Sequence, residues 1–145
     1  MDDFESLTRT PDAVDLFMFS AAQWLLHRIH YDSVYATESE GHPALVVHGP
    51  LQAVYLTQLI RHNLGQGAMI STFTYRHLRP VYLGQRLTCG GRVVSRTETG
   101  QSVTCEVWTE HDDGTRATEG VAEVTVGSES SPSGDVDCEN PGRPA

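Results

Sequence analysis

Residues 48–67, HGPLQAVYLTQLIRHNLGQG, constrain the fold most strongly, because they combine a helical pattern with almost no charge. Pro50 suits the first turn of a helix, Gly49 suits the position before it, and Gly65 is a stop signal. Arg61 is the only charged residue before that stop. Helical spacing relates Leu51, Val54, Tyr55, Gln58, Leu59 and His62. We therefore expect this helix to be largely buried, with a sheet wrapped around it.

The second half of the chain predicts an antiparallel sheet. Strand-like runs occupy residues 69–78, 85–98, 101–111 and 115–127, and the turns ETGQ and HDDGT carry the glycine that hairpins favour. Val103, Cys105 and Val107 share one face of their strand, which indicates a sheet with one buried face. Before the long helix we expect a strand in the apolar run that precedes His30, then a short helix at 32–38. This order predicts an α+β fold, a long central helix wrapped by a curved antiparallel β-sheet.

Composition divides the chain into three parts. The last eighteen residues, SESSPSGDVDCENPGRPA, are mostly Ser, Gly, Pro and acidic. Such a segment buries too little apolar surface to offset its loss of conformational entropy, so we expect 128–145 to be a disordered tail. The first residues, MDDFESLTRTPD, predict a flexible N-terminus at 1–12. One folded domain should then occupy 13–127.

The charge and the cysteines exclude several classes of protein. A net charge of −9 argues against nucleic-acid binding, which needs a basic face. No apolar run reaches the ~18 residues of a membrane span, and the start of the chain lacks the basic and apolar regions of a secretory signal. We expect a cytoplasmic protein with neither nucleic-acid nor membrane partners. Cys89, Cys105 and Cys138 form no CxxC pair, which argues against a metal site and leaves the first two as core residues.

The stretch FSAAQWLLHRIHYD, residues 19–32, places ionisable side chains directly after an apolar run. Imidazole titrates near neutral pH, so His30 is a candidate for moving protons at the mouth of a pocket. The alternative is a hydrogen-bonded structural histidine at the end of a strand. Asp32 fits the N-cap of the short helix. Arg28 fits an ion partner, and His27 a surface or packing residue.

Three segments in order, FSAAQW…HRIHYDSVYA, EGHPALVVHGPLQAVYL and FTYRHLRPVYLGQRLTCGGRV, resemble the MaoC-like hotdog hydratases and dehydratases. The resemblance covers about residues 15–126 and is greatest to the branch with hydroxyacyl-thioester dehydratases and mesaconyl-C4-CoA hydratases. It implies a single hotdog fold, usually in a dimer, that adds or removes water next to the carbonyl of an acyl thioester. By this resemblance His30 is the reactive histidine, and the Gly49 backbone N–H contacts the thioester oxygen.

Elementary chemistry agrees with these two roles. Removing water from a 3-hydroxyacyl thioester needs a base for the α-proton and an acid for the departing hydroxyl, and one histidine can serve both steps in turn. The enolate-like intermediate places negative charge on the thioester oxygen. Unpaired N–H groups at a helix start suit that charge, and Gly49 permits close approach. No metal or prosthetic group is implied, because CoA or a phosphopantetheine arm comes with the substrate.

One position departs from the family pattern. The residue five before the reactive histidine is an aspartate in MaoC-type enzymes and commonly an asparagine in this branch, but here it is Leu25. Leucine cannot hold a water or a hydroxyl. Either His27 or another polar group supplies the missing function, or His30 works alone in an easier reaction such as a polyketide-like cyclisation or isomerisation. The remaining alternative is that hydration is lost and the chain only binds acyl groups or pairs with an active partner.

Several other residues are candidates for substrate contact. Leu25 and Leu26 would make an apolar wall, and Trp24 fits either the core or a substrate contact. His48 would line the pocket or fix the backbone before Gly49. Arg76 and Arg79 would contact the phosphates of CoA or a phosphopantetheine arm, or form ion pairs with acidic residues. We expect a homodimer, with an acyl carrier protein as a possible further partner.

Overall fold

The computed structural model describes residues 2–127, so the tail expected at 128–145 lies outside the described residues. Residues 2–127 form five strands, two α-helices and two shorter helical segments. In order these are β1 (Leu7–Arg9), α1 (Ala13–Gln23), η1 (Arg28–His30), η2 (Tyr35–Ser39), α2 (Gly49–Leu64), β2 (Met69–His77), β3 (Leu87–Arg96), β4 (Ser102–Glu110) and β5 (Arg116–Thr125).

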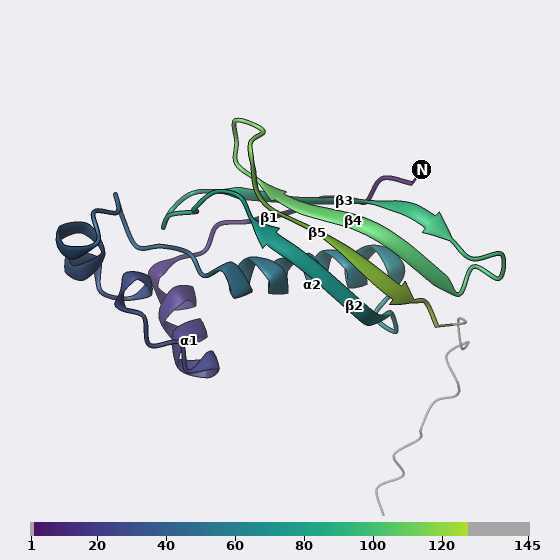
Figure 1. The fold of residues 1–145 in the computed structure, drawn as a ribbon, viewed down its shortest axis with the longest axis horizontal. Helices are drawn as coiled ribbons and strands as arrows, with labels where there is room; N and C mark the ends of the chain where they lie inside the picture. Colours follow the sequence, from purple (N-terminus) through teal and green to yellow (C-terminus); the bar gives the residue numbers. More distant parts are fainter. Residues whose placement is uncertain (1, 128–145) are drawn as a thin grey trace, which may run out of the picture.

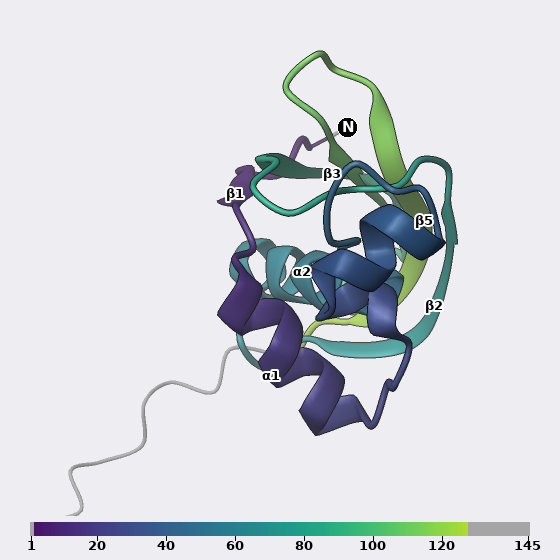
Figure 2. The same ribbon diagram turned by 90° about the vertical axis from the view of Figure 1, so that its left-hand side faces the viewer.

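The five strands form one antiparallel sheet in the order β1-β3-β4-β5-β2. It curves around α2, which lies along its concave face (Figures 1 and 2). The predicted meander is confirmed as β3, β4 and β5, in which Val107 lies opposite Gly91 on one side and Gly120 on the other. Val103, Cys105 and Val107 are buried, as predicted. The predicted α+β fold with a hotdog arrangement is therefore confirmed.

Helix α2 follows its sequence signals closely. Pro50 lies in its first turn, and Gly65, with a φ of 97°, ends it in a conformation that L-residues rarely adopt. Leu56, Leu59 and Ile60 are fully buried beneath the sheet. The helix begins at the end that faces the viewer in Figure 2, directly after His48, whose ring stacks on that of His30 in η1.

The expectation of a flexible segment at 1–12 is wrong for most of that segment. β1 pairs with β3, the Phe4 N–H donates to the Gly91 carbonyl at 2.8 Å, and the Glu5 N–H donates to Asn63 Oδ1 at 2.7 Å. Phe4 lies so close over Gly91 that a Cβ there would be 2.6 Å from the Phe4 ring. The polar composition hid these contacts, because they are formed by backbone groups and one aromatic ring.

The strand expected before His30 is also wrong, because residues 13–23 form helix α1. Asp12 and Asp15 form a reciprocal capping box at its start. Leu16 and Ser20, four residues apart, face the core, a spacing that a continuous apolar run conceals. The helix ends at Trp24, whose φ is 53°. Trp24 is 77% exposed and is therefore not a core residue.

The short helix expected at 32–38 is present, with a π-helical segment at Tyr35–Ser39. Asp32 caps it as predicted, since Asp32 Oδ1 accepts from the Tyr35 N–H at 3.0 Å. Arg28 forms the expected ion pair, with Asp32, at 2.7 Å. Within residues 2–127, no helix has the length and apolar character needed to cross a membrane.

Candidate active site at the start of helix α2

His30 ends the short helical segment η1 and is held by the backbone of a distant segment. Its Nδ1 lies 2.7 Å from the Val46 carbonyl oxygen, and the Val46 N–H in turn donates to the Ile29 carbonyl at 3.0 Å. A carbonyl only accepts, so Nδ1 carries the proton and the neutral ring presents Nε2 as a base. Burial lowers the pKa of His30, with a smaller contribution from the nearby His27. His30 is therefore fixed in the tautomer that proton abstraction requires.

His48 lies directly behind His30. The two rings stack with centroids 3.8 Å apart and planes 20° from parallel. His48 is fully buried, and its Nε2 lies 2.8 Å from Ser20 Oγ. Among the described residues, His48 Nδ1 is the one buried side-chain nitrogen or oxygen atom that has no hydrogen-bond partner. Burial lowers the pKa of His48 to about 4, so the ring supports His30 as a neutral surface. Of the two roles expected for His48, the structure does not show the first, because His48 is not among the residues that line the pocket.

A pocket of about 360 Å³ opens at the start of α2. Its lining includes His30, Val46, Gly49, Gln52, His77 and Arg79. His30 and Gly49, nineteen positions apart in the sequence, both line this pocket. The first N–H groups of α2 have no partner within the helix, and the helix dipole adds positive potential there. This end of the pocket suits a developing negative charge on an oxygen.

His77 is the site residue that sequence reasoning missed. Its ring lies against Gly49 so closely that a Cβ on Gly49 would be 2.2 Å from His77 Nε2. Its Nδ1 lies 2.9 Å from Thr118 Oγ1 on the neighbouring strand β5, and burial lowers its pKa. Nothing in YRHLRP distinguishes this histidine from a solvent-facing residue of an edge strand. What marks His77 as a site residue is its cross-strand pairing with Thr118, and a single sequence does not show that pairing.

Three predicted residues lie outside this pocket. Leu25 and Trp24 line a separate apolar groove of about 190 Å³ with Phe17, Ser20, Ala21, Leu26 and Tyr31. They do not form a wall of the His30 pocket. His27 is exposed, its ring centroid lies 6.1 Å from that of His30, and its Nδ1 accepts from the Ile29 N–H. His27 therefore borders the site without lining it.

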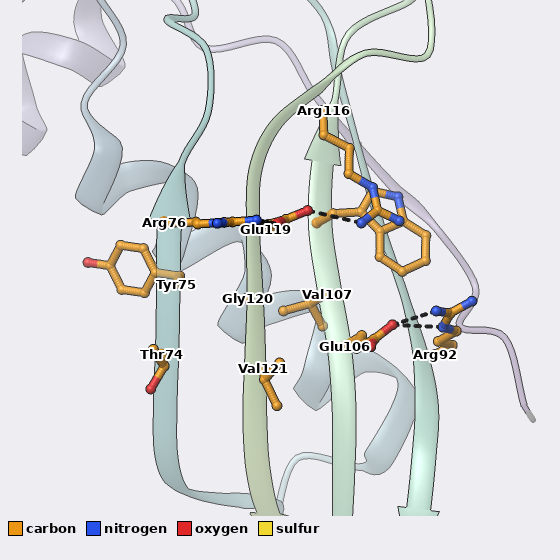
Figure 3. A pocket seen from close by; sticks show the side chains of 11 residues that line it. Thr74, Tyr75, Arg76, Arg92, Glu106, Val107, Arg116, Glu119, Gly120 and Val121 are labelled. Carbon is orange, nitrogen blue, oxygen red and sulfur yellow. Dashed lines mark hydrogen bonds and ion pairs between the residues drawn. The ribbon is translucent and has the colours of Figure 1, made fainter.

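The two candidate arginines separate. Arg76 lies on the outer face of the sheet, where it pairs with Glu119 at 2.6 Å in a depression of about 490 Å³ (Figure 3). Arg79 lines the His30 pocket and also a neighbouring depression of about 580 Å³ that contains Arg86 and His111. Of the two, Arg79 alone borders the His30 pocket. The outer-face depression is crossed by ion pairs and lies on the other side of the sheet from α2 (Figure 3).

Comparisons with known proteins agree with this geometry. The sequence model of the family described as "hydroxyacyl-thioester dehydratase type 2" matches residues 2–83. A mesaconyl-C(4)-CoA hydratase of Chloroflexus aurantiacus is 48% identical over 80 residues, which are 54% of this chain and 28% of that protein. The matched region thus spans little more than a quarter of the curated relative.

Solved structures resemble the chain over a longer stretch. The R-hydratase PhaJ1 of Pseudomonas aeruginosa has a TM-score of 0.79 at 22% identity, covering 87% of this chain and 81% of that one. A chain of the ChsH1-ChsH2 complex of Mycobacterium tuberculosis has a TM-score of 0.77 at 16% identity, covering 86% and 94%. At these identities the likeness establishes a shared fold.

Proposed function

Since the chain belongs to the hydroxyacyl-thioester dehydratase type 2 family, we propose that it catalyses the reversible addition of water to a 2-enoyl thioester. The observation that carries the proposal is the hydrogen bond from His30 Nδ1 to the Val46 carbonyl. It leaves Nε2 as a base in the same pocket as the start of α2. A relative of this family is named as a CoA-thioester hydratase, which supports the same substrate class here.

In the proposed reaction His30 is the acid/base at the carbon next to the thioester carbonyl. In the dehydration direction its Nε2 removes the α-proton, and the electron pair moves onto the thioester oxygen. The Gly49 N–H at the start of α2 stabilises the resulting oxyanion. The buried, uncharged His48 keeps a second positive charge away from His30. The altered dyad, with Leu25 in place of the usual polar residue, is part of this proposal.

The decisive test is a mass-spectrometric assay on short and long 3-hydroxyacyl and 2-enoyl thioesters, which reports a change of one water. We expect the wild type to interconvert at least one pair and His30→Gln to lose about 100-fold or more in kcat. His62→Gln is the matched control, because His62 lies in the last turn of α2, far along the helix from Gly49. A His30→Gln variant as active as the control would refute the role of His30.

We further propose that Arg79 binds a phosphate of CoA or of a phosphopantetheine arm. Arg79 borders both the His30 pocket and the adjoining depression, whereas Arg76 is paired with Glu119 on the outer face. Arg79→Gln should raise KM for CoA thioesters but leave KM for N-acetylcysteamine thioesters, which lack phosphate, unchanged. Arg76→Gln is the matched control. Equal effects on both substrates would contradict this assignment.

We expect two chains to associate. β2 is an edge strand of the sheet, and Met69 at its start is 71% exposed. Unpaired edges of this kind favour pairing with another chain. Light scattering on the purified protein should give twice the chain mass, and a monomer at micromolar concentration would contradict the expectation.

A non-catalytic partner subunit is the second candidate. Leu25 favours it, and one chain of similar fold is known from a complex named for two different chains. If the wild type converts no thioester while Leu25→Asn does, the pocket has been diverted from hydration. Mixing with candidate hotdog partners, followed by light scattering, would then separate a partner subunit from a cyclase or isomerase.

A further inference from the structure

A short chain of buried polar groups leads from the core to the His30 pocket and ends at His77. Gln52 of α2, Thr109 of β4 and Thr118 of β5 are at most 2% exposed, and with Ser20 and His48 they are the buried polar residues among those that the structure describes. The hydroxyls of Thr109 and Thr118 both donate to Gln52 Oε1, at 3.0 and 2.9 Å. Burying three polar side chains costs free energy unless each of them forms hydrogen bonds inside the protein. The last member of the chain, Thr118, contacts His77.

These hydrogen bonds fix which nitrogen of His77 carries the proton. The Thr118 hydroxyl has one hydrogen, and it is donated to Gln52 Oε1. Thr118 Oγ1 must therefore accept from His77, so Nδ1 is the protonated nitrogen. Nε2 is left with its lone pair. That lone pair lies at the surface of Gly49, beside the N–H groups that would hold the thioester oxygen.

His77 is exposed at the end of β2, and the groups that surround its ring disfavour a charged imidazolium. The pKa of His77 is lowered by partial burial of its ring, and the positive end of the α2 dipole acts in the same direction. Tyr75, His30 and Arg79 are the other titratable groups around it, and none of them is an acid that would favour an imidazolium. At neutral pH His77 Nε2 is thus available to accept a hydrogen bond.

We propose that His77 is the second proton-transfer residue of the site, holding the water or the 3-hydroxyl in place of the polar side chain that Leu25 lacks. This inference rests on the proposed hydratase activity and adds to it the residue that acts on oxygen. His77 lies on β2 against Gly49, whereas Leu25 lines a separate groove. Thr118 is a positioning residue, because it acts through His77.

The proton balance of the step is simple. In hydration, His77 Nε2 accepts a proton from water while the water oxygen bonds to C3. The C2=C3 electron pair shifts toward the thioester, forming the enolate. The His30 imidazolium then gives its Nε2 proton to C2, and the carbonyl is restored. One water is added, and solvent returns a proton to His30 and removes one from His77 before the next turnover. Dehydration follows the same steps in reverse.

The threonines provide a matched pair for the test. Thr109→Val and Thr118→Val each remove one buried hydroxyl and one hydrogen bond to Gln52, but Thr118 alone contacts His77. A purely structural role predicts equal effects of the two changes. Positioning of His77 predicts that Thr118→Val lowers kcat about tenfold while Thr109→Val stays within about twofold, KM being similar in both.

The experiment measures kcat and KM for hydration of a 2-enoyl thioester by the full chain. We expect His77→Leu to lower kcat about 100-fold with little change in KM, and His77→Gln, whose amide can still hold water, to be about tenfold more active than His77→Leu. Thermal melting of each variant checks the fold. A His77→Leu enzyme with wild-type kcat, or equal losses in the two threonine variants, would overturn the proposal while leaving the hydratase intact. A wild type that converts no thioester would instead remove the proposed function, and this inference with it.

Discussion

His48 should dominate the sensitivity of the fold to acid. In the unfolded chain its pKa is near the ordinary 6.5, whereas burial lowers the pKa to about 4 in the folded chain. A lowered pKa for a base means that the unfolded state takes up the proton first. Stability is therefore complete above pH 6.5 and is lost as the pH falls from there toward 4.

The magnitude follows from the two pKa values. Each unit of difference between the folded and unfolded pKa corresponds to about 1.4 kcal/mol in the free energy of unfolding. For His48, most of this free energy is lost between pH 7 and pH 5. Linkage gives a loss of about 2 kcal/mol in the free energy of unfolding over that interval from His48 alone. The His48 side chain is inaccessible to solvent, which is the cause of the lowered pKa. His30 and His77, whose pKa values are also lowered by burial, add to the loss with the same sign.

The perturbation is His48→Gln, whose amide can still reach Ser20 but does not titrate. Denaturant unfolding at pH 7, 6 and 5, at one protein concentration, gives the free energy of unfolding of each protein. We expect the wild type to lose about 2 kcal/mol more than the variant between pH 7 and 5. His62→Gln, which removes a partly exposed histidine that contacts Glu5, is the control for loss of a histidine elsewhere in the fold. The argument would be refuted if wild type and His48→Gln had parallel pH profiles, whatever their absolute stabilities.

Three further predictions concern other parts of the molecule. Gly49→Ala should remove activity with little change in melting temperature, because the backbone at this position accepts alanine but the new Cβ displaces the His77 ring. Adding His77→Ala to this variant should relieve the clash without restoring turnover. Asn63→Ala should cost about 1–2 kcal/mol in denaturant unfolding and abolish hydrogen-exchange protection at the Glu5 amide, which it caps. Cys89 and Cys105, buried with pKa values raised to about 11, should resist a thiol reagent at pH 8 in the native protein and react on unfolding, as peptide mass mapping would record.

Local patterns in the sequence were enough to predict the centre of the fold. The spacing, Pro50 and Gly65 define α2, and alternation with glycine turns defines the β3–β5 meander. These features succeed because their determinants are adjacent in sequence. Helix α1 differs from the predicted strand because a short continuous apolar run fits a strand or a helix equally, and the Asp12 capping box decides for the helix. The family resemblance then placed His30 and Gly49 together.

The rest of the site depends on contacts between distant residues. His77 acquires its place from Thr118, 41 positions later, which in turn bonds to Gln52, 66 positions earlier. No local pattern records such a chain. Leu25 and Trp24 are likewise separated from the His30 pocket because α1 ends at Trp24 in a left-handed backbone conformation. No sequence pattern predicts that conformation for a tryptophan. Arg76 and Arg79, three residues apart, diverge because β2 ends between them.

The contact between Phe4 and Gly91 carries an evolutionary consequence. A methyl group on Gly91 would lie 2.6 Å from the Phe4 ring and 3.0 Å from both the Glu106 carbonyl oxygen and a Val107 methyl carbon. A larger residue at 91 therefore needs position 4 to become small first, and the other two neighbours to shift. Loss of the ring first leaves an intermediate with an uncovered glycine. In homologues, position 4 should therefore become small before position 91 becomes larger. No homologue should have a bulky residue at both positions.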